Sequence, residues 1–279
     1  MKWNIVADSS CDITELPGLA PDAGFSIASL KVYVGDKEFV DDASLDPLVQ
    51  LEAMKANKSA SSTACPAPFD WAKEFEKADC SFGVTISSQL SGSYNSAIVA
   101  KDMILEKHPE KKIHVFDSRG TSGEMILLLI RINSLIKAGK SFDEIVNEVE
   151  QYNNTLQLTF CLVSFDNLIK SGRMSAFTGI IATKLGIRAI AMKTPKGEIN
   201  VLSKQRGDHK TYKYIVDQMA GMKNLKESYI IISHVRNEDG ARKIKSMLRE
   251  YYDATNVAII PCRGLCTFYA DDGGLIISY

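Results

Sequence analysis

Three clusters of hydroxyl-bearing residues could do chemistry in the first half of the sequence. Asp8-Ser9-Ser10, the run from Ser87 to Ser93, and Asp117-Ser118 each follow directly on a short apolar run. Hydroxyl donors at the start of a helix can hold an anion, because they add to the unpaired N–H groups and the positive dipole end found there. Such residues also cap helices, so a strand-to-helix turn explains each cluster equally well. Phosphate, sulfate and carboxylate are all compatible ligands.

A serine nucleophile is the other chemistry that these clusters suggest. Ser91-Gly92-Ser93 lies at an expected strand-to-helix turn, where a nucleophile could be exposed. No G-x-S-x-G elbow occurs, however, and no histidine stands in a context that nominates a triad base. We therefore assign no catalytic residue. An enzyme that acts on a small phosphorylated or carboxylated metabolite at the Ser91 turn is the alternative function.

Motifs for nucleotides and metals are missing from the sequence. It has no G-x-x-x-x-G-K-[ST], no G-x-G-x-x-G after a strand and no H-E-x-x-H. The six cysteines are scattered without a C-x-x-C, so we interpret them as small buried hydrophobic residues rather than as zinc ligands. We expect neither a cofactor nor a metal ion.

The composition is that of an ordinary globular protein. Of 279 residues, 45% are hydrophobic and 24% are charged, which suits a large core and, at roughly 100 to 200 residues per domain, two domains. Thirty-three Lys and Arg against 34 Asp and Glu give a net charge of −1, so nothing favours a nucleic-acid partner. The longest apolar run, residues 125–130, is far shorter than the roughly 20 residues of a membrane-spanning helix, and the start resembles no signal peptide. We expect a cytoplasmic protein.

Short apolar runs alternate with helical patterns in the first half, which is typical of strand-helix-strand units with a parallel sheet. The expected strands are residues 3–7, 82–86 and 113–116, and the expected helices are 94–105, one from Glu124 and one from Phe142. Thr121-Ser122-Gly123-Glu124 and Ser141-Phe142-Asp143-Glu144 both have the pattern of a capping box. Residues 27–40 are expected to form a hairpin around Gly35 or an extended excursion, and the small-residue stretch 59–68 is expected to be a loop.

The second half contains a hairpin signal, Pro195-Lys196-Gly197, between two apolar runs. Its sheet is therefore expected to contain antiparallel pairs. The expected strands are residues 156–163, 187–192, 199–204, 229–233, 257–260 and 274–279, with helices at 210–222 and 239–252. The fold class is thus α/β, with a domain boundary near residue 155.

Five motifs follow one another in order at residues 6–12, 63–68, 86–97, 115–118 and 168–175. They read VADSSCD, TACPAP, ISSQLSGSYNSA, VFDS and LIKSGRMS. These resemble V-T-D-S-S-x-D, T-S-Q-P-S-P, I-S-S-x-L-S-G-T-Y-x-S-A, V-x-D-S and L-x-K-x-G-R-I-S of the DegV family of bacterial fatty-acid-binding proteins. One such motif is weak, but five in register are specific.

The resemblance implies a Rossmann-like parallel-sheet domain over residues 1–155, which carries the head-group loops. It also implies an α/β domain over residues 156–279, whose mixed, largely antiparallel sheet forms an acyl-chain tunnel. One long-chain fatty acid would lie with its tail in this tunnel and its carboxylate at the domain junction. A protein of this kind is not catalytic: it presents the fatty acid to a separate fatty acid kinase, and transient membrane contact is compatible with that role.

The resemblance also implies site residues. Thr63 and Ser91 would be the hydroxyl donors to the carboxylate, and Arg173 matches the family's arginine at the head-group end. The implied head-group site is Thr63, Ser91, Gly92, Ser93, Arg173 and Tyr269, supported by Ser62, Ser96, Asp8 and Ser9. Asp8 and Asp117 are expected to organise turns, since a carboxylate would repel an anionic ligand. The apolar helix stripes are expected to be ordinary core rather than tunnel wall: Ile180, Ile181 and Leu185, and Ile126, Leu127 and Ile130.

Two departures from the family pattern bear on the head group. Tyr269 stands where the family usually has the histidine of G-x-H-x-G-P-G, and a phenol carries no positive charge at pH 7. Asp271 and Asp272 beside it add negative charge. Weaker carboxylate binding, a different head group or a missing kinase partnership would each follow. The second, milder departure is Ala64 and Cys65 in place of Ser and Gln.

Overall fold

A computed structural model of the chain describes residues 2–57, 59–174 and 187–279. The strands are β1 (Trp3–Asp8), β2 (Ala23–Ala28), β3 (Lys31–Val34), β4 (Lys37–Val40), β5 (Ser61–Ala64), β6 (Cys80–Thr85), β7 (Lys112–Asp117), β8 (Leu158–Leu162), β9 (Ile187–Lys193), β10 (Ile199–Arg206), β11 (Ile230–His234), β12 (Val257–Pro261) and β13 (Leu275–Ser278). The helices are α1 (Pro47–Ala56), α2 (Pro68–Phe75), α3 (Ser93–Lys107), α4 (Gly123–Lys137), α5 (Phe142–Asn153), α6 (Asp166–Lys170), α7 (Asp208–Met222), α8 (Glu238–Tyr252) and α9 (Gly264–Ala270), with short 3₁₀ turns η1 (Ser9–Cys11) and η3 (Leu225–Glu227).

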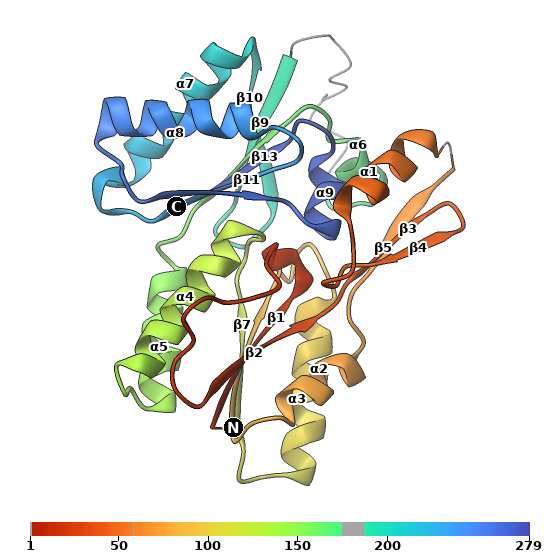
Figure 1. Ribbon diagram of the computed structural model, residues 1–279, viewed down its shortest axis with the longest axis vertical. Coiled ribbons are helices and arrows are strands. Elements are labelled where there is room, and N and C mark those ends of the chain that lie inside the picture. Colours follow the sequence, from red (N-terminus) through yellow and green to blue (C-terminus); the bar gives the residue numbers. More distant parts are fainter. Residues whose placement is uncertain (1, 58, 175–186) are drawn as a thin grey trace.

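The first large sheet has four strands in the order β2-β1-β6-β7, and every pair in it is parallel. Helices α4 and α5 cover one face and α2 and α3 the other, as Figure 1 shows. Side chains alternate between these two layers: Ile5 packs with α4 and α5, whereas Val6 packs with α2 and α3. The predicted Rossmann-like parallel sheet is confirmed. The strand ends that carry the hydroxyl clusters meet at one edge of this sheet.

The second large sheet has six strands in the order β10-β9-β8-β13-β11-β12. Its pairs are antiparallel except β11 with β12, which confirms a mixed, largely antiparallel sheet. Helices α7 and α8 cover its outer face, as Figure 1 shows. Cys161 and Ile190 pack with residues of these helices on that face. Phe160, Leu162 and Ile276 lie on the opposite face. We call the parts built around the two large sheets the amino-terminal and carboxy-terminal lobes; the domain boundary near residue 155 stays a prediction.

A small antiparallel sheet in the order β4-β3-β5 projects beside the amino-terminal lobe. Its β3–β4 hairpin turns at Gly35, whose φ of +59° suits glycine, and this confirms the hairpin predicted within residues 27–40. The stretch predicted to be a loop instead contains β5, in which Thr63 pairs with Val32 of β3. The ladder consists of backbone hydrogen bonds, so a run of small polar residues can add an edge strand without apolar alternation.

One of the two predicted capping boxes is confirmed. The Ser141 hydroxyl accepts from the Glu144 N–H at 3.4 Å, and the Glu144 carboxylate accepts from the Ser141 N–H at 2.9 Å. The other is wrong, because the N-cap of α4 is Ser122 and not Thr121, the Ser122 side chain makes no cap hydrogen bond, and Glu124 forms a buried ion pair with Lys193 of β9. The lysine of the other lobe thus pairs with the carboxylate that the local sequence pattern assigns to a helix cap.

None of the helices in the described ranges is long and apolar enough to cross a membrane.

Candidate functional site

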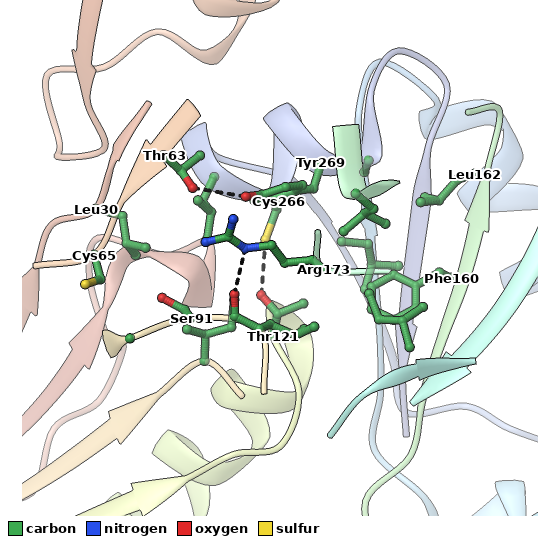
Figure 2. A pocket seen from close by; sticks show the side chains of 18 of the residues that line it. Leu30, Thr63, Cys65, Ser91, Thr121, Phe160, Leu162, Arg173, Cys266 and Tyr269 are labelled. Carbon is green, nitrogen blue, oxygen red and sulfur yellow. Dashed lines mark hydrogen bonds between the residues drawn. The ribbon is translucent and has the colours of Figure 1, made fainter. Parts of the chain in front are cut away.

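A cavity of about 260 Å³ lies where the two lobes meet. A buried water needs only roughly 10 to 15 Å³ of such space, so this cavity can hold an organic ligand. Its polar walls are Thr63, Ser91, Thr121, Arg173 and Tyr269. Its apolar walls are Leu30, Ile86, Leu90, Phe160, Leu162, Leu168, Ile199, Leu265 and Ile276. Figure 2 shows Thr63 and Ser91 on one side and Phe160 and Leu162 on the other, with Arg173 between them.

The C-terminal end of α6 places Arg173 at the cavity. The N–H of Gly172 bonds to the carbonyl of Ile169 at 3.0 Å, and the N–H of Arg173 bonds to the carbonyl of Leu168 at 2.9 Å. This pair of bonds is a Schellman motif, which requires a left-handed residue at Gly172, and its φ is +74°. The glycine before the arginine therefore has a structural reason, and the sequence Ser171-Gly172-Arg173 turns the guanidinium back toward the amino-terminal lobe.

The Arg173 guanidinium is held by carbonyl groups and not by a carboxylate. Its Nε donates to the carbonyl of Leu90 at 3.1 Å and its Nη1 to the carbonyl of Ser171 at 2.7 Å. Across residues 2–57, 59–174 and 187–279, no Asp or Glu forms an ion pair with it. A half-buried cation that lines a largely apolar cavity is stabilised by an anion brought there by a ligand.

Ser91 keeps a hydrogen to donate. Its hydroxyl oxygen accepts from the N–H of Ser93 at 3.3 Å, which leaves its own O–H free for a ligand. Gly92 is the N-cap of the 15-residue helix α3 and lines the cavity, so the positive end of that helix lies at the same place. A Cβ on Gly92 would approach Cys65 Sγ to 3.3 Å, and glycine lets the two segments pack closely.

Thr63 and Tyr269 form a hydroxyl pair across the lobes, with their oxygens 3.0 Å apart. One of the two hydroxyl hydrogens makes this bond, whichever residue donates, and the other hydrogen remains for a ligand. The Tyr269 ring is fixed by an edge-to-face contact with Phe268 at 4.9 Å. The pair is drawn in Figure 2 above Ser91 and Arg173.

Asp8 organises the turns behind the cavity. Its carboxylate accepts from the N–H of Ile86 at 2.9 Å, from the Ser93 hydroxyl at 2.7 Å and from the N–H of Ser10 at 3.2 Å. Burial raises its pKa, and these hydrogen bonds oppose that shift. Ser93 therefore spends its hydroxyl on Asp8 and does not line the cavity, unlike the position implied for it. Ser9 likewise lies behind the site, where its hydroxyl accepts from the N–H of Leu30 at 3.0 Å.

The remaining implied residues lie around the cavity. Ser62 is exposed, since it points to the opposite side of β5 from Thr63. The Ser96 hydroxyl lies 3.9 Å from Cys65 Sγ, and neither Ser62 nor Ser96 lines the cavity.

The negative charge expected beside Tyr269 is directed elsewhere. Asp272 forms ion pairs with Lys55 at 2.9 Å and with Arg236 at 3.3 Å. Asp271 accepts from the N–H of Asp272 at 2.7 Å, and neither carboxylate lines the cavity between the lobes.

The apolar walls were missed because they come from alternate positions on separate strands. Phe160 and Leu162 face the cavity from β8, and Ile276, paired with Phe160, faces it from β13. The available signal was the alternation of large apolar side chains along residues 158–162. Thr121 was assigned to a helix cap, but its hydroxyl donates to the carbonyl of Ser10 at 3.3 Å beside the cavity.

The helix residues that were expected to be core have three different outcomes. Ile126 and Leu127 are buried in the core of the amino-terminal lobe, which confirms that they are not tunnel wall. Ile130 is 49% exposed, so the prediction that it is core is wrong. Ile180, Ile181 and Leu185 lie outside the described residues.

No group of three or more His, Cys, Asp or Glu side chains that could hold a metal ion occurs in the part of the chain that the structure describes.

Comparisons with known proteins agree over the whole length of the chain. A family model described as "Uncharacterised protein, DegV family" matches residues 2–279. A DegV domain-containing protein of Streptococcus gordonii is 40% identical, over 100% of this chain and 99% of its own. Among solved structures, the Streptococcus pneumoniae Fatty Acid Kinase (Fak) B3 protein loaded with linoleic acid has a TM-score of 0.96 and 39% identity, with coverage of 100% and 99%. A Eubacterium eligens DegV family protein loaded with heptadecanoic acid has a TM-score of 0.94 and 35% identity, with coverage of 99% and 98%.

Proposed function

The chain belongs to the DegV family, and on this premise we propose that it binds one long-chain fatty acid at the junction of its lobes. The carboxylate would lie among Thr63, Ser91 and Arg173, and the tail would lie against Phe160, Leu162 and the neighbouring apolar walls. The observation that carries this proposal is the half-buried Arg173, a cation without a carboxylate partner in the described chain, on the wall of a largely apolar cavity. The two solved relatives that hold linoleic and heptadecanoic acid support it.

The head group would receive three kinds of donor. Ser91 offers its O–H, the Thr63–Tyr269 pair offers one more, and Arg173 offers a charged N–H. A buried carboxylate without such donors costs several kcal/mol or takes up a proton. Arg173, which matches the family's arginine, would carry the positive charge at the head group, so we propose that a carboxylate is held here without the family histidine.

The tail would supply most of the binding free energy. Removal of a chain of about 14 carbons from water is favourable by about 0.8 kcal/mol per methylene, hence on the order of 10 kcal/mol before opposing terms. Loss of translational freedom and ordering cost several kcal/mol. The remainder permits micromolar or tighter binding, provided that the donors above satisfy the carboxylate.

We propose a carrier rather than an enzyme. A serine nucleophile needs an adjacent base, and no His, Asp or Glu is among the described residues that line the cavity. This favours fatty-acid binding over the alternative, an enzyme that acts on a small metabolite at Ser91. The carrier would work in the cytoplasm, hold no cofactor and present the carboxylate to a separate fatty acid kinase.

Mass spectrometry of an organic extract of the purified protein tests the binding. We expect about one equivalent of long-chain fatty acid per chain, and micromolar or tighter binding of linoleic acid by the delipidated protein in calorimetry. An extract free of fatty acid, together with no heat of binding, would contradict the proposal. Addition of a fatty acid kinase and ATP to the loaded protein then tests presentation through the appearance of acyl-phosphate.

A further inference from the structure

We call the segment from Ser87 to Gly92 the head-group loop. The carboxy-terminal lobe forms a hydrogen bond with this loop near each of its ends. The Ser87 hydroxyl donates to the carbonyl of Gly197, in the turn between β9 and β10, at 2.7 Å. Near the other end, Arg173 Nε donates to the carbonyl of Leu90 at 3.1 Å. Both contacts join residues more than 80 positions apart in the sequence. The head-group loop belongs to the amino-terminal lobe, but its position depends on the other lobe.

Ser87 forms several of the hydrogen bonds within this loop. Its carbonyl accepts from the N–H of Leu90 at 3.0 Å and from the N–H of Ser91 at 3.1 Å. Its hydroxyl oxygen accepts from the N–H of Gln89 at 3.2 Å, while its hydrogen goes to Gly197. Ser87 is fully buried and does not line the cavity, so it would act on a ligand only through Ser91 and Gly92.

The β9–β10 turn is seated closely against the loop. Gly197 has a φ of +90°, and a Cβ there would overlap the Ser87 hydroxyl and come within 3.0 Å of the Arg119 Cα. The turn is closed by a bond from the Gly197 N–H to the Thr194 carbonyl at 2.9 Å. Glycine is thus required both by the left-handed backbone and by the close approach of Ser87.

A buried ion pair fixes the strand that leads into this turn. Lys193, the last residue of β9, pairs with Glu124 of α4, and their side chains are 7% and 0% exposed. Loss of either partner of such a pair leaves an uncompensated buried charge. The turn is therefore held against the amino-terminal lobe independently of the Ser87 contact.

We propose that the β9–β10 turn is a positioning element of the ligand site, which sets the Ser91 hydroxyl and the Gly92 N–H through Ser87. This inference rests on the proposed fatty-acid function for the identity of the ligand. It adds that the carboxylate donors of the amino-terminal lobe are aligned only when the carboxy-terminal lobe is seated, since Gly197 and Arg173 fix the two parts of the loop. Ser87 is a positioning residue and touches no ligand.

Ser87→Ala tests this directly, because it removes the hydroxyl and introduces no steric conflict. The matched control is Ser81→Ala in β6, the strand that precedes the loop: Ser81 is equally buried and also donates to a backbone carbonyl, that of Phe75, at 3.2 Å. Affinities are measured for linoleic acid and for the alcohol of the same chain. We expect Ser87→Ala to weaken acid binding about tenfold and alcohol binding about threefold, because hydrogen bonds to a charged group are roughly twice as strong in free energy. Ser81→Ala should leave both affinities within about twofold of the natural protein.

Amide hydrogen exchange of Leu90 and Ser91, whose N–H groups bond to the Ser87 carbonyl, gives a second measurement in delipidated protein that needs no ligand. We expect faster exchange in Ser87→Ala than in Ser81→Ala. If Ser87→Ala does not fold, Pro195→Gly is used instead, because it loosens the exposed part of the turn. We expect it to change the affinities and the amide exchange in the same direction, but by less. Equal losses for acid and alcohol, or unchanged exchange at both amides, would overturn the positioning role.

The two proposals fail in different ways. Natural protein that binds neither acid nor alcohol would refute the fatty-acid function, and exchange at Leu90 and Ser91 would still decide the positioning role. Natural protein that binds the acid while Ser87→Ala matches it in affinity and exchange would refute the positioning role alone.

Discussion

The Thr63 hydroxyl lies 3.0 Å from the phenol oxygen of Tyr269, so that a strand of the small sheet and a helix of the carboxy-terminal lobe meet over the cavity. This contact gives Tyr269 a polar partner at the position where the family usually carries a histidine. The positive charge on the cavity wall is that of Arg173, which matches the family's arginine, so the departure at residue 269 removes one possible positive charge and leaves this one in place. The hydroxyl groups of Thr63, Ser91 and Tyr269 are further donors on the cavity wall.

Tyr269→Phe removes the phenol hydroxyl and keeps the ring that packs on Phe268. Thr63 can then turn its own O–H to the ligand, so only the linking bond is lost. We expect fatty-acid binding to weaken by about 0.5 to 1.5 kcal/mol in calorimetric titration of delipidated protein. Tyr229→Phe, at a tyrosine that is 65% exposed, is the control and should bind like the natural protein. A loss of several kcal/mol would mean that the phenol is the main donor and would contradict this assignment.

Tyr269→His places the family's usual side chain at the site. Histidine has an unperturbed pKa of about 6.5, so its positive charge appears as the pH falls from 8 to 6. We expect fatty-acid affinity of this variant to rise over that interval, while Tyr269→Phe shows no comparable rise. Dissociation constants measured at pH 8, 7 and 6 check this. A flat profile for the histidine variant would place the carboxylate away from residue 269.

Arg173→Met should have the largest effect on the acid. It removes the one cationic side chain among the described residues that line the cavity, and we expect a loss of about 2 to 3 kcal/mol for fatty acid and less than about 1 kcal/mol for the alcohol of the same chain. Arg242→Met is the control, since Arg242 is exposed and its one ion pair among the described residues is with Glu238 of its own helix. Equal losses for acid and alcohol would show that Arg173 supports the fold of the site and does not bind the head group.

Ser91→Ala is expected to weaken fatty-acid binding by about 1 to 3 kcal/mol, the range for loss of a hydrogen bond to a charged group. Ser62→Ala serves as the matched control, because Ser62 is an exposed serine beside Thr63 that does not line the cavity. Both variants should have the thermal midpoint of the natural protein within a few degrees. Unchanged affinity for Ser91→Ala in a titration of delipidated protein would count against the head-group assignment.

Local patterns predicted several of the helices and strands well, whereas the site residues were implied by the resemblance to the DegV family. The apolar runs that form β1, β6 and β7 and the Ser141 capping box can be identified from neighbouring residues, and these are confirmed. The position of Arg173 at the cavity also has a local cause, because the hydrogen bonds that end α6 involve Gly172 and its near neighbours. In such cases the physical cause lies within a few residues of the predicted feature.

Long-range partners decided the rest. Glu124 leaves its predicted cap for Lys193, 69 residues further along the chain. Ser93 gives its hydroxyl to Asp8, so a residue with a suitable type and position turns away from the cavity. The tail walls, such as Phe160, come from sheet faces whose orientation depends on pairing between distant strands. No local pattern specifies which of two nearby acceptors a side chain will choose.

We expect the pH dependence of the free energy of unfolding to depend on Asp12, whose carboxylate is hydrogen-bonded to residues of both lobes. Its carboxylate is buried, accepts from the Arg263 N–H at 2.6 Å and is bonded by the Ser122 hydroxyl, and burial raises its pKa to about 7. The unfolded value is 3.8, so between about pH 4 and 7 the folded protein carries a proton that the unfolded chain lacks. The stabilisation due to this proton is present below about pH 4 and is lost as the pH rises through 7. The total change is on the order of 4 kcal/mol.

Asp12→Asn isolates this contribution, because asparagine keeps an acceptor oxygen, does not titrate and tolerates the left-handed backbone of residue 12, whose φ is 62°. Urea unfolding of the natural protein and of the variant is compared at pH 5, 6, 7 and 8. We expect the natural protein to lose stability relative to the variant across this range, so that the difference between them is most unfavourable to the natural protein at pH 8. Because other buried carboxyl groups such as Glu124 titrate in both proteins, their effects cancel in the difference. Parallel stability curves, or a natural protein that gains on the variant as the pH rises, would show that Asp12 is ionised in the folded junction, held there by the Arg263 and Ser122 bonds.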